Sequence, residues 1–168
     1  MEVVVPAMAS VMQDLIARVT RAGAEARFSA RALGDAELQA LLGAARVAPS
    51  ADNLQTWRFV VVRDAERRRA LAQAAARPVD QCADQAPVML VACGVRAVVT
   101  RIRNEQPFVW IDVPIAITNL LLEATELGLA YAWTLEPDEA RVRQILGIPD
   151  EVRVIALCAL GWPEVKSE

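Results

Sequence analysis

The sequence predicts a single α+β domain that spans residues 1–168. The length of 168 residues is that of one ordinary domain and is enough to bury a core without disulfides. Two hydrophobic patterns alternate along the chain: apolar residues at helical spacing, and short continuous apolar runs that indicate buried strands. We therefore expect helices and strands to share one core.

Helices are predicted where apolar residues fall on one face and capping signals mark the ends. Gly23 interrupts the segment that follows the first helix, Pro114 fits only near the start of the fourth, and Gly147 ends the fifth. The fourth helix is apolar nearly all round, as expected of a buried central helix. The predicted helices are residues 7–19, 35–46, 64 to about 76, 112–128 and 139–146.

Strands are predicted from short apolar runs bounded by turn residues. Residues 78–87 are expected to form a loop, whereas residues 94–107 have little periodicity and are the least readable segment. The predicted strands are residues 57–63, 88–93, 130–134 and 152–160.

The composition argues against several classes of function. A formal net charge of -3 provides no electrostatic footprint for nucleic acid. The chain has no histidine, which excludes a Ser-His or Cys-His nucleophile, and its three cysteines have no metal-ligand spacing. No apolar run reaches the roughly 18 to 20 residues of a membrane span. We expect a cytoplasmic protein without metal, with Cys93 and Cys158 as small core residues in a reducing compartment.

The hydrophobic content predicts a partner subunit. Hydrophobic residues make up 55% of the chain, which is above the usual range for a globular domain. A single small domain leaves roughly 30% of the surface of its unfolded chain accessible and therefore cannot cover every apolar helix face. The first helix presents six such positions, namely Met8, Val11, Met12, Leu15, Ile16 and Val19.

Residues 49–55 form the first candidate site, and we call them the amide loop. Pro49 cannot extend the preceding helix because it lacks an N–H. Ser50, Asn53 and Gln55 bring polar side chains onto a loop that is held at both ends, and such loops commonly bind ligands. Each amide offers one acceptor and two donors, which suits an uncharged heterocycle with alternating carbonyls and ring nitrogens better than a metal or a phosphate.

The string P-S-x-x-N-x-Q-x-W from Pro49 to Trp57, which precedes an R-F-V-V-V strand, resembles the nitroreductase family of FMN-dependent oxidoreductases. That family usually has proline where this chain has Thr56. The resemblance implies a nitroreductase-like fold, in which helices flank a mainly antiparallel sheet, and a homodimer with FMN near the subunit interface. It implies that the flavin is bound by Pro49, Ser50, Asn53 and Gln55. Turn formation alone also accounts for Ser50 and Asp52.

Residues 27–31 form the second candidate site, which we call the arginine segment. They are similar to the family string R-x-S-x-R-x-F, in which the first basic residue and the serine hold the FMN phosphate and the second basic residue reaches the flavin ring edge. These roles fall on Arg27, Ser29 and Arg31. A guanidinium suits a phosphate because its planar fork of donors meets two oxygens at once.

The register of this resemblance has an alternative. In the register above, Leu33 stands where the family has an aromatic residue. A second register aligns Phe28 with the family phenylalanine, which moves the triplet to residues 22–24 and loses both basic positions.

Two further stretches carry implied roles. Leu135 and Glu136 stand where the family places a backbone N–H that hydrogen-bonds flavin N5, usually with one or two glycines. Residues 161–163 (G-W-P) resemble a family G-Y-P string, after which a K-x-R pair binds the phosphate. Lys166 matches the first basic residue of that pair, whereas Glu168 has the wrong charge for the second.

The resemblance implies an enzyme whose flavin performs the chemistry. The expected reaction is reduction of a nitroaromatic, a quinone or a similar small molecule with electrons from NAD(P)H. Two alternatives stay open: flavin-dependent oxidation of a small or peptide-derived molecule, and a fold that has lost efficient use of FMN. No residue distinguishes NADH from NADPH or identifies the substrate.

Overall fold

The computed structural model describes residues 6–24, 27–75, 84–95 and 108–164. Within them, four strands form one antiparallel sheet in the order β1-β2-β4-β3, and helices pack on it. The helices are α1 (Pro6–Ala24), α2 (Asp35–Arg46), α3 (Ala65–Ala72), α4 (Val109–Glu126) and α5 (Glu139–Leu146), with a short 3-10 helix η1 (Ala51–Asn53). The strands are β1 (Trp57–Val62), β2 (Val88–Val95), β3 (Ala130–Thr134) and β4 (Val152–Gly161). The predicted α+β class and antiparallel sheet are confirmed.

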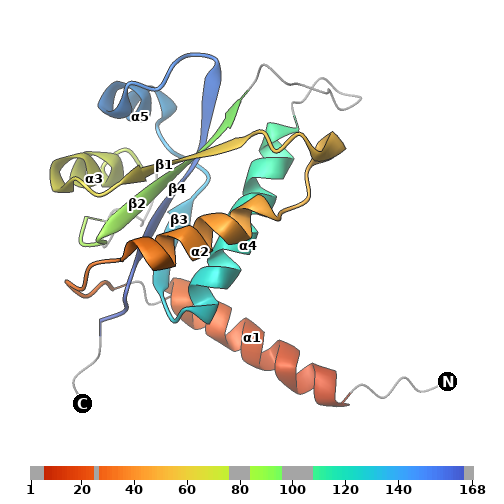
Figure 1. Cartoon of the computed structure of the whole chain (residues 1–168). Coiled ribbons are helices and arrows are strands. Elements are labelled where there is room, and N and C mark those ends of the chain that lie inside the picture. The colour runs from red at the N-terminus through yellow and green to blue at the C-terminus, as the bar shows by residue number, and fades with distance from the viewer. Residues whose placement is uncertain (1–5, 25–26, 76–83, 96–107, 165–168) are drawn as a thin grey trace.

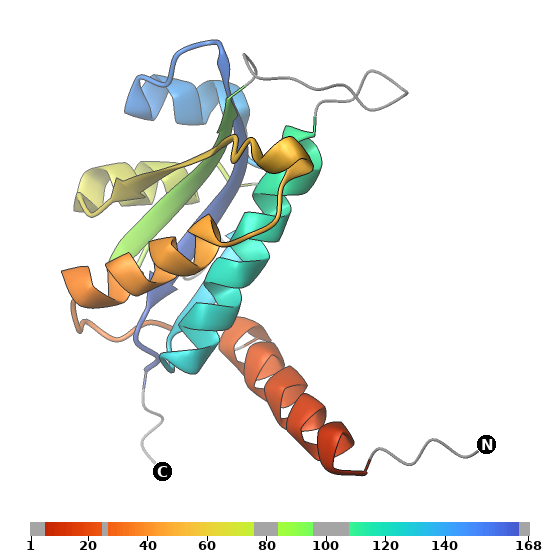
Figure 2. The same cartoon turned by 45° about the vertical axis from the view of Figure 1, so that its right-hand side comes forward.

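The elements form three layers (Figures 1 and 2). Helices α2 and α4 cover one face of the sheet, α3 and α5 cover the other, and α1 leaves the body beside the end of α4. The buried residues divide into two clusters accordingly, because successive side chains of a strand point to opposite faces. In β4, for example, Leu160 faces the α2/α4 layer and Ala159 faces the α3/α5 layer.

The register defines two ends of the sheet. Trp57 of β1 pairs with Gly94 of β2, which in turn pairs with Arg153 of β4; we call this the Gly94 end. At the opposite end, Ala130 of β3 pairs with Gly161 of β4; we call this the Gly161 end. Strand β4 has 10 residues, so the two ends lie about 25 to 30 Å apart.

Helix α1 extends further than the sequence predicted. It was expected to end near Val19 because Gly23 was interpreted as a break, but it continues to Ala24. Gly23 instead allows close packing on β3: a Cβ there would lie 3.2 Å from Cε2 of Tyr131, and the ring would have to shift to make room. The hydroxyl of Tyr131 donates to the carbonyl oxygen of Val19 at 3.1 Å, which fixes this end of α1 on β3.

Helix α4 also begins earlier than predicted, at Val109 rather than at residue 112. Pro114 therefore lies inside the helix, where it cannot donate a backbone hydrogen bond to the preceding turn because it has no N–H. The apolar composition of this segment had predicted a helix that is buried on all sides, but one of its faces is exposed. Ile111 and Leu122 remain 45% and 39% exposed, and with Ile115 and Thr118 they follow the 4-3-4 spacing of one helix face.

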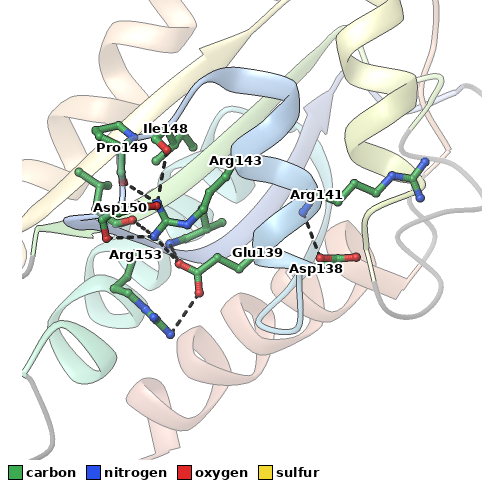
Figure 3. A network of polar contacts seen from close by, with 10 residues as sticks. Asp138, Glu139, Arg141, Arg143, Ile148, Pro149, Asp150 and Arg153 are labelled. Carbon is green, nitrogen blue, oxygen red and sulfur yellow. Dashed lines mark hydrogen bonds and ion pairs between the residues drawn. The ribbon is translucent and has the colours of Figure 1, made fainter.

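The turn between α5 and β4 is fixed by an ion-pair network (Figure 3). Arg143 pairs with Glu139 at 2.8 Å and donates to the carbonyl oxygens of Ile148, Pro149 and Val152. Glu139 also pairs with Arg153 at 3.1 Å. The accepting carbonyl groups belong to the turn after α5 and to the first residue of β4, so these bonds join α5 to the Gly94 end of β4.

Candidate functional site

The amide loop lies at the Gly94 end of the sheet, between α2 and β1 (Figure 1). Its backbone is unusual because Asp52, Asn53 and Gln55 all have positive φ angles of 49°, 55° and 47°. Non-glycine residues adopt this left-handed region at a cost, and asparagine and aspartate tolerate it best. Such a conformation persists only where the surroundings enforce it.

Hydrogen bonds inside the loop supply part of that enforcement. The backbone N–H of Gln55 donates to Oγ of Ser50 at 3.0 Å, and Nε2 of Gln55 donates to Oδ1 of Asn53 at 3.3 Å and to the carbonyl oxygen of Arg46 at 3.4 Å. The loop residues therefore shape the turn, which is the role that turn formation alone would give them. Pro49, Asn53 and Gln55 are nevertheless exposed, so the same groups remain accessible to a ligand.

A buried carboxylate at the start of α4 anchors the loop. The backbone N–H of Ala51 donates to Oδ1 of Asp112 at 3.2 Å, although the two residues are 61 positions apart. Asp112 is only 3% exposed, and its Oδ2 atom has no hydrogen-bond partner among the described residues. Burial raises the pKa of Asp112, and the bond from Ala51 partly opposes that rise.

Close packing holds the loop's C-terminal side against the start of α4. The carbonyl oxygen of Thr56 accepts the N–H of Val95 at 3.0 Å, which joins the loop to the end of β2. A Cβ on Gly94 would lie 2.8 Å from Cβ of Val109, so only glycine allows α4 to approach the sheet here. The loop is thus built on rigid elements.

The arginine segment lies at the opposite, Gly161 end. It pairs with the residues that follow β4: the N–H of Ser29 donates to the carbonyl oxygen of Trp162 at 2.9 Å, and the N–H of Glu164 donates to the carbonyl oxygen of Arg27 at 3.0 Å. Phe28 forms an isolated antiparallel bridge with Pro163. This pairing makes the segment extended, so alternate residues 27 and 29 point the same way.

Arg31 stacks on an aromatic ring. Its guanidinium carbon lies 3.6 Å from the centroid of the Trp162 indole, and its backbone N–H donates to Oγ of Ser29 at 3.4 Å. A cation placed over an indole face is attracted by the ring quadrupole. The structure therefore groups Arg27, Ser29 and Arg31 around residues 162–164, which lead toward Lys166; Lys166 itself lies outside the described residues.

Leu135 and Glu136 form the link between β3 and α5. Leu135 is exposed, and the backbone N–H of Glu136 donates to Oγ1 of Thr134 at 3.1 Å. Pro137 then forms an isolated bridge with Ala75, which fixes the link to the end of α3. Of the two backbone N–H groups implied by resemblance, that of Glu136 already has a partner.

The two main parts of the predicted site do not meet within one chain. The amide loop is at the Gly94 end and the arginine segment at the Gly161 end, about 25 Å apart along β4. Helix α2 lies between them with 12 residues, a length of about 18 Å. Figure 2 shows them at opposite ends of this helix.

Large apolar side chains remain exposed on α1 and α4. On α1, Val11 is 71% exposed, and Met12 and Ile16 are more than half exposed. On α4, Ile111 and Leu122 are exposed on the face that the chain's own core leaves uncovered. Arg18 secures the base of α1 to α4 through an ion pair with Glu126 at 2.7 Å, so the exposed part of α1 projects from a fixed base.

The described residues offer few other reactive groups. Among them, no three His, Cys, Asp or Glu side chains are grouped closely enough to bind a metal ion. Burial raises the pKa of Cys93 to about 11 and that of Cys158 to about 12, so neither thiol is a nucleophile near neutral pH. No helix in the described part of the chain has the length and apolar character needed to cross a membrane.

Solved structures share this fold. A nitroreductase family protein from Clostridium novyi NT superimposes with a TM-score of 0.77 at 27% identity, covering 82% of this chain and 78% of its own. An FMN-dependent nitroreductase from Clostridium difficile R20291 superimposes with a TM-score of 0.72 at 23% identity, covering 84% and 83%. The architecture is therefore that of nitroreductase-fold oxidoreductases.

The sequence comparison identifies the family. The model of the nitroreductase family matches residues 27–162, so this chain belongs to the nitroreductase family. A protein of Archaeoglobus fulgidus, provisionally named an NADH dehydrogenase/NAD(P)H nitroreductase, is 33% identical over 143 residues, which are 82% of this chain and 78% of that protein. The predictions of the family, the fold and an oxidoreductase are confirmed.

Two residues of the site were missed in the sequence. Asp112 was not interpreted as part of a site, although it is the only charged residue between Val109 and Leu122, which is a signal of a buried partner. Trp162 was noted only as part of a family string, and its contact with Arg31 has no signal in the sequence because 131 positions separate them.

Proposed function

We propose that this protein is an FMN-dependent enzyme that takes electrons from NAD(P)H and reduces a nitroaromatic, a quinone or a similar small acceptor. The observation that carries this proposal is the chemistry of the two candidate sites. The amide loop presents uncharged donors and acceptors, whereas the arginine segment presents two guanidinium groups and a hydroxyl. A flavin ring needs the first set, and a phosphate needs the second.

The described residues fit FMN in these roles. Asn53 and Gln55 are exposed and would hydrogen-bond the ring edge, with Pro49 and Ser50 beside them. Arg27 and Ser29 project from one side of an extended strand and would hold the phosphate. Arg31, held over Trp162, would reach the ring edge. Residues 22–24, which the second register requires, lie in the last turn of α1, so the paired extended segment supports the first register.

When bound, a flavin accepts a hydride at N5 and passes electrons on. The chain itself would position the donor, the ring and the acceptor, and would exclude water from them. No side chain with a proton-transfer pKa near neutrality is required, which agrees with a chain that has no histidine and whose buried thiols stay protonated.

The separation of the two parts supports a homodimeric site. One FMN cannot contact groups about 25 Å apart along β4, so a complete site needs the amide loop of one copy and the arginine segment of another. The exposed apolar faces of α1 and α4 offer a surface for such a dimer. Its interface would be of the hydrophobic obligate kind, about 2,000 Å² or more.

A second candidate function rests on Glu136. Its backbone N–H already donates to Thr134, and the neighbouring Leu135 cannot adopt the backbone angles that a glycine could. The backbone contact to flavin N5 would therefore lack its usual geometry. A nitroreductase-fold protein that binds FMN weakly and acts mainly as a binding protein would follow.

We also propose a cytoplasmic location, because the described thiols Cys93 and Cys158 are unpaired.

Flavin titration tests the proposal directly. We expect the purified protein to bind one FMN per chain, with quenching of flavin fluorescence, and the loaded protein to oxidise NADH or NADPH when a quinone or nitroaromatic is added. A protein that quenches no flavin fluorescence would contradict the proposal. Tight FMN binding without NAD(P)H oxidation would instead favour a flavin-dependent oxidation of another molecule, which a screen of reduced substrates with oxygen would detect.

A further inference from the structure

The buried carboxylate Asp112 contacts the amide loop from the start of α4. We propose that Asp112 is a positioning residue, which holds the amide loop in its flavin-binding conformation through the backbone N–H of Ala51. This inference rests on the proposed function, because the loop is the part of the site assigned to the flavin ring. Its first step, the fixation of the loop, concerns the protein without flavin.

The loop needs an external anchor. Three of its non-glycine residues, Asp52, Asn53 and Gln55, have left-handed backbone angles, and such angles persist only when neighbouring structure enforces them. The bonds from Gln55 reach only residues nearby in the sequence. Among the described residues, the bond from Ala51 is the one hydrogen bond from residues 49–55 themselves to a distant element; the bond to β2 is made by the next residue, Thr56.

Asp112 is a costly choice of anchor. It is 97% buried, and only one of its two oxygens has a partner in the described part of the chain. A buried carboxylate with an unpaired oxygen destabilises a fold, and an apolar residue of similar size at such a position is often more stable. Burial accordingly raises its pKa. Asp112 accepts the N–H of Ala51, and residues 52, 53 and 55 directly after Ala51 have left-handed backbone angles, so the carboxyl group is placed to hold the loop's conformation.

Two substitutions of Asp112 separate the effect of its hydrogen bond to Ala51 from the effect of changing a buried residue. Asp112→Ala removes the acceptor, whereas Asp112→Asn keeps an oxygen that can accept the N–H of Ala51. The matched control is Thr125→Val, which deletes a buried hydrogen bond in the same helix, from Oγ1 of Thr125 to the carbonyl oxygen of Leu121, far from the loop. Every variant is measured at a temperature where its unfolding curve shows it to be fully folded.

The first measurement is amide hydrogen exchange in the protein without flavin. We expect peptides covering residues 49–55 to exchange at least tenfold faster in Asp112→Ala than in the wild type, and within about twofold of the wild type in Asp112→Asn and Thr125→Val. Unchanged exchange of this loop in Asp112→Ala would overturn the inference, whether or not the protein binds flavin.

The second measurement is the affinity for FMN and for riboflavin. Loss of the anchor should weaken both ligands by about tenfold in Asp112→Ala, because the loop contacts the ring that both share. Asp112→Asn should restore the affinity to within about threefold. Equal losses in Asp112→Ala and Thr125→Val would mean that Asp112 is merely structural, and would overturn the positioning role.

The donor side gives an independent variant if Asp112→Ala does not fold. Ala51→Pro removes the N–H itself, and the backbone accepts proline there because Ser50 is extended, with φ -143° and ψ 159°, and Ala51 is the first residue of η1. We expect the same tenfold loss of both ligands, and exchange of the loop amides at least tenfold faster than in the wild type. Unchanged affinity and unchanged loop exchange in a folded Ala51→Pro protein would overturn the inference. If loop exchange changes as expected but the wild type binds no flavin, the proposed function fails while the anchor stands.

Discussion

The amide loop and the arginine segment are held in place in contrasting ways. The arginine segment is an extended strand that pairs with residues 162–164 through ordinary backbone hydrogen bonds, and its side chains need no unusual backbone. The amide loop has three residues in left-handed conformation and depends on a buried carboxylate of α4. If the amide loop binds the flavin ring and the arginine segment binds the phosphate, as proposed, this difference matches the ligand, because hydrogen bonds to a ring edge depend strongly on distance and angle.

The largest expected effect comes from separating the two copies that the proposed site joins. Leu122→Glu places a charge on the exposed apolar face of α4, where it leaves the chain's own core intact. We expect sedimentation to show monomers at micromolar concentration and flavin binding to be lost. Ala140→Glu, which adds the same charge to the exposed face of α5, should stay dimeric. A monomeric Leu122→Glu protein that still holds FMN would contradict a flavin site shared between two copies.

The next largest effect concerns the proposed contact between Arg27 and the phosphate of FMN. Arg27→Ala should weaken FMN by about 10- to 100-fold, because a charge-assisted hydrogen bond contributes about 1.5 to 3 kcal/mol. Riboflavin has no phosphate, so its affinity should change by less than about twofold. Fluorescence titration with both ligands measures the ratio, with Arg67→Ala on the exposed side of α3 as control. Equal losses for the two ligands would favour the alternative register.

A smaller effect is expected on the ring side. Asn53→Ala should weaken FMN and riboflavin alike, by about 1 kcal/mol or slightly more, since one hydrogen bond to the ring is lost. The substitution also places alanine at a φ of 55°, which costs loop stability. Asn53→Gly separates these causes, because glycine accepts that angle without strain. If Asn53→Gly binds flavin as the wild type does, the asparagine amide has no contact with the ring.

The smallest effect concerns the stability of the protein without flavin. Burial raises the pKa of Asp112 above its ordinary value of 3.8, so the unfolded chain loses this proton at lower pH than the folded chain does. Stability therefore falls as pH rises from 3.8 through the raised pKa, and it stays lower above it. Asp112→Asn should unfold at higher denaturant concentration than the wild type at pH 7, with the difference vanishing toward pH 3. A less stable variant at pH 7 would contradict this sign.

Much of the fold could be predicted from local patterns. The apolar runs predicted β1, β3 and β4 to within one residue, and Gly147 marked the end of α5; the third predicted helix began at residue 64, which is the N-cap of α3. Helix α3 nevertheless ends at Ala72 rather than near residue 76, because the next residues pair with the segment before α5. Such tertiary contacts leave no periodic signal.

The candidate site was predictable only in part. The strings around Asn53 and Arg27 identified both of its regions, because short motifs with a chemical mechanism are visible in one sequence. Their separation could not be predicted, since it depends on the register of β4. The bond from Asp112 to Ala51 joins residues 61 positions apart and is invisible without coordinates. The ligand-binding roles of the amide loop and of the arginine segment stay predictions, as do those of Leu135, Glu136 and Lys166.

The most direct test of the account asks whether one site takes its two parts from two copies. Arg27→Ala and Asn53→Ala chains with different affinity tags are co-expressed, and the mixed dimer is isolated by sequential purification. If each site is shared between copies, the mixed dimer has one site with both substitutions and one intact site, so it should bind one FMN with wild-type affinity. A dimer of the doubly substituted chain with wild type should contain no intact site. Two weakened sites in the mixed dimer, each carrying one of the substitutions, and one intact site in the second dimer would contradict a site shared between copies.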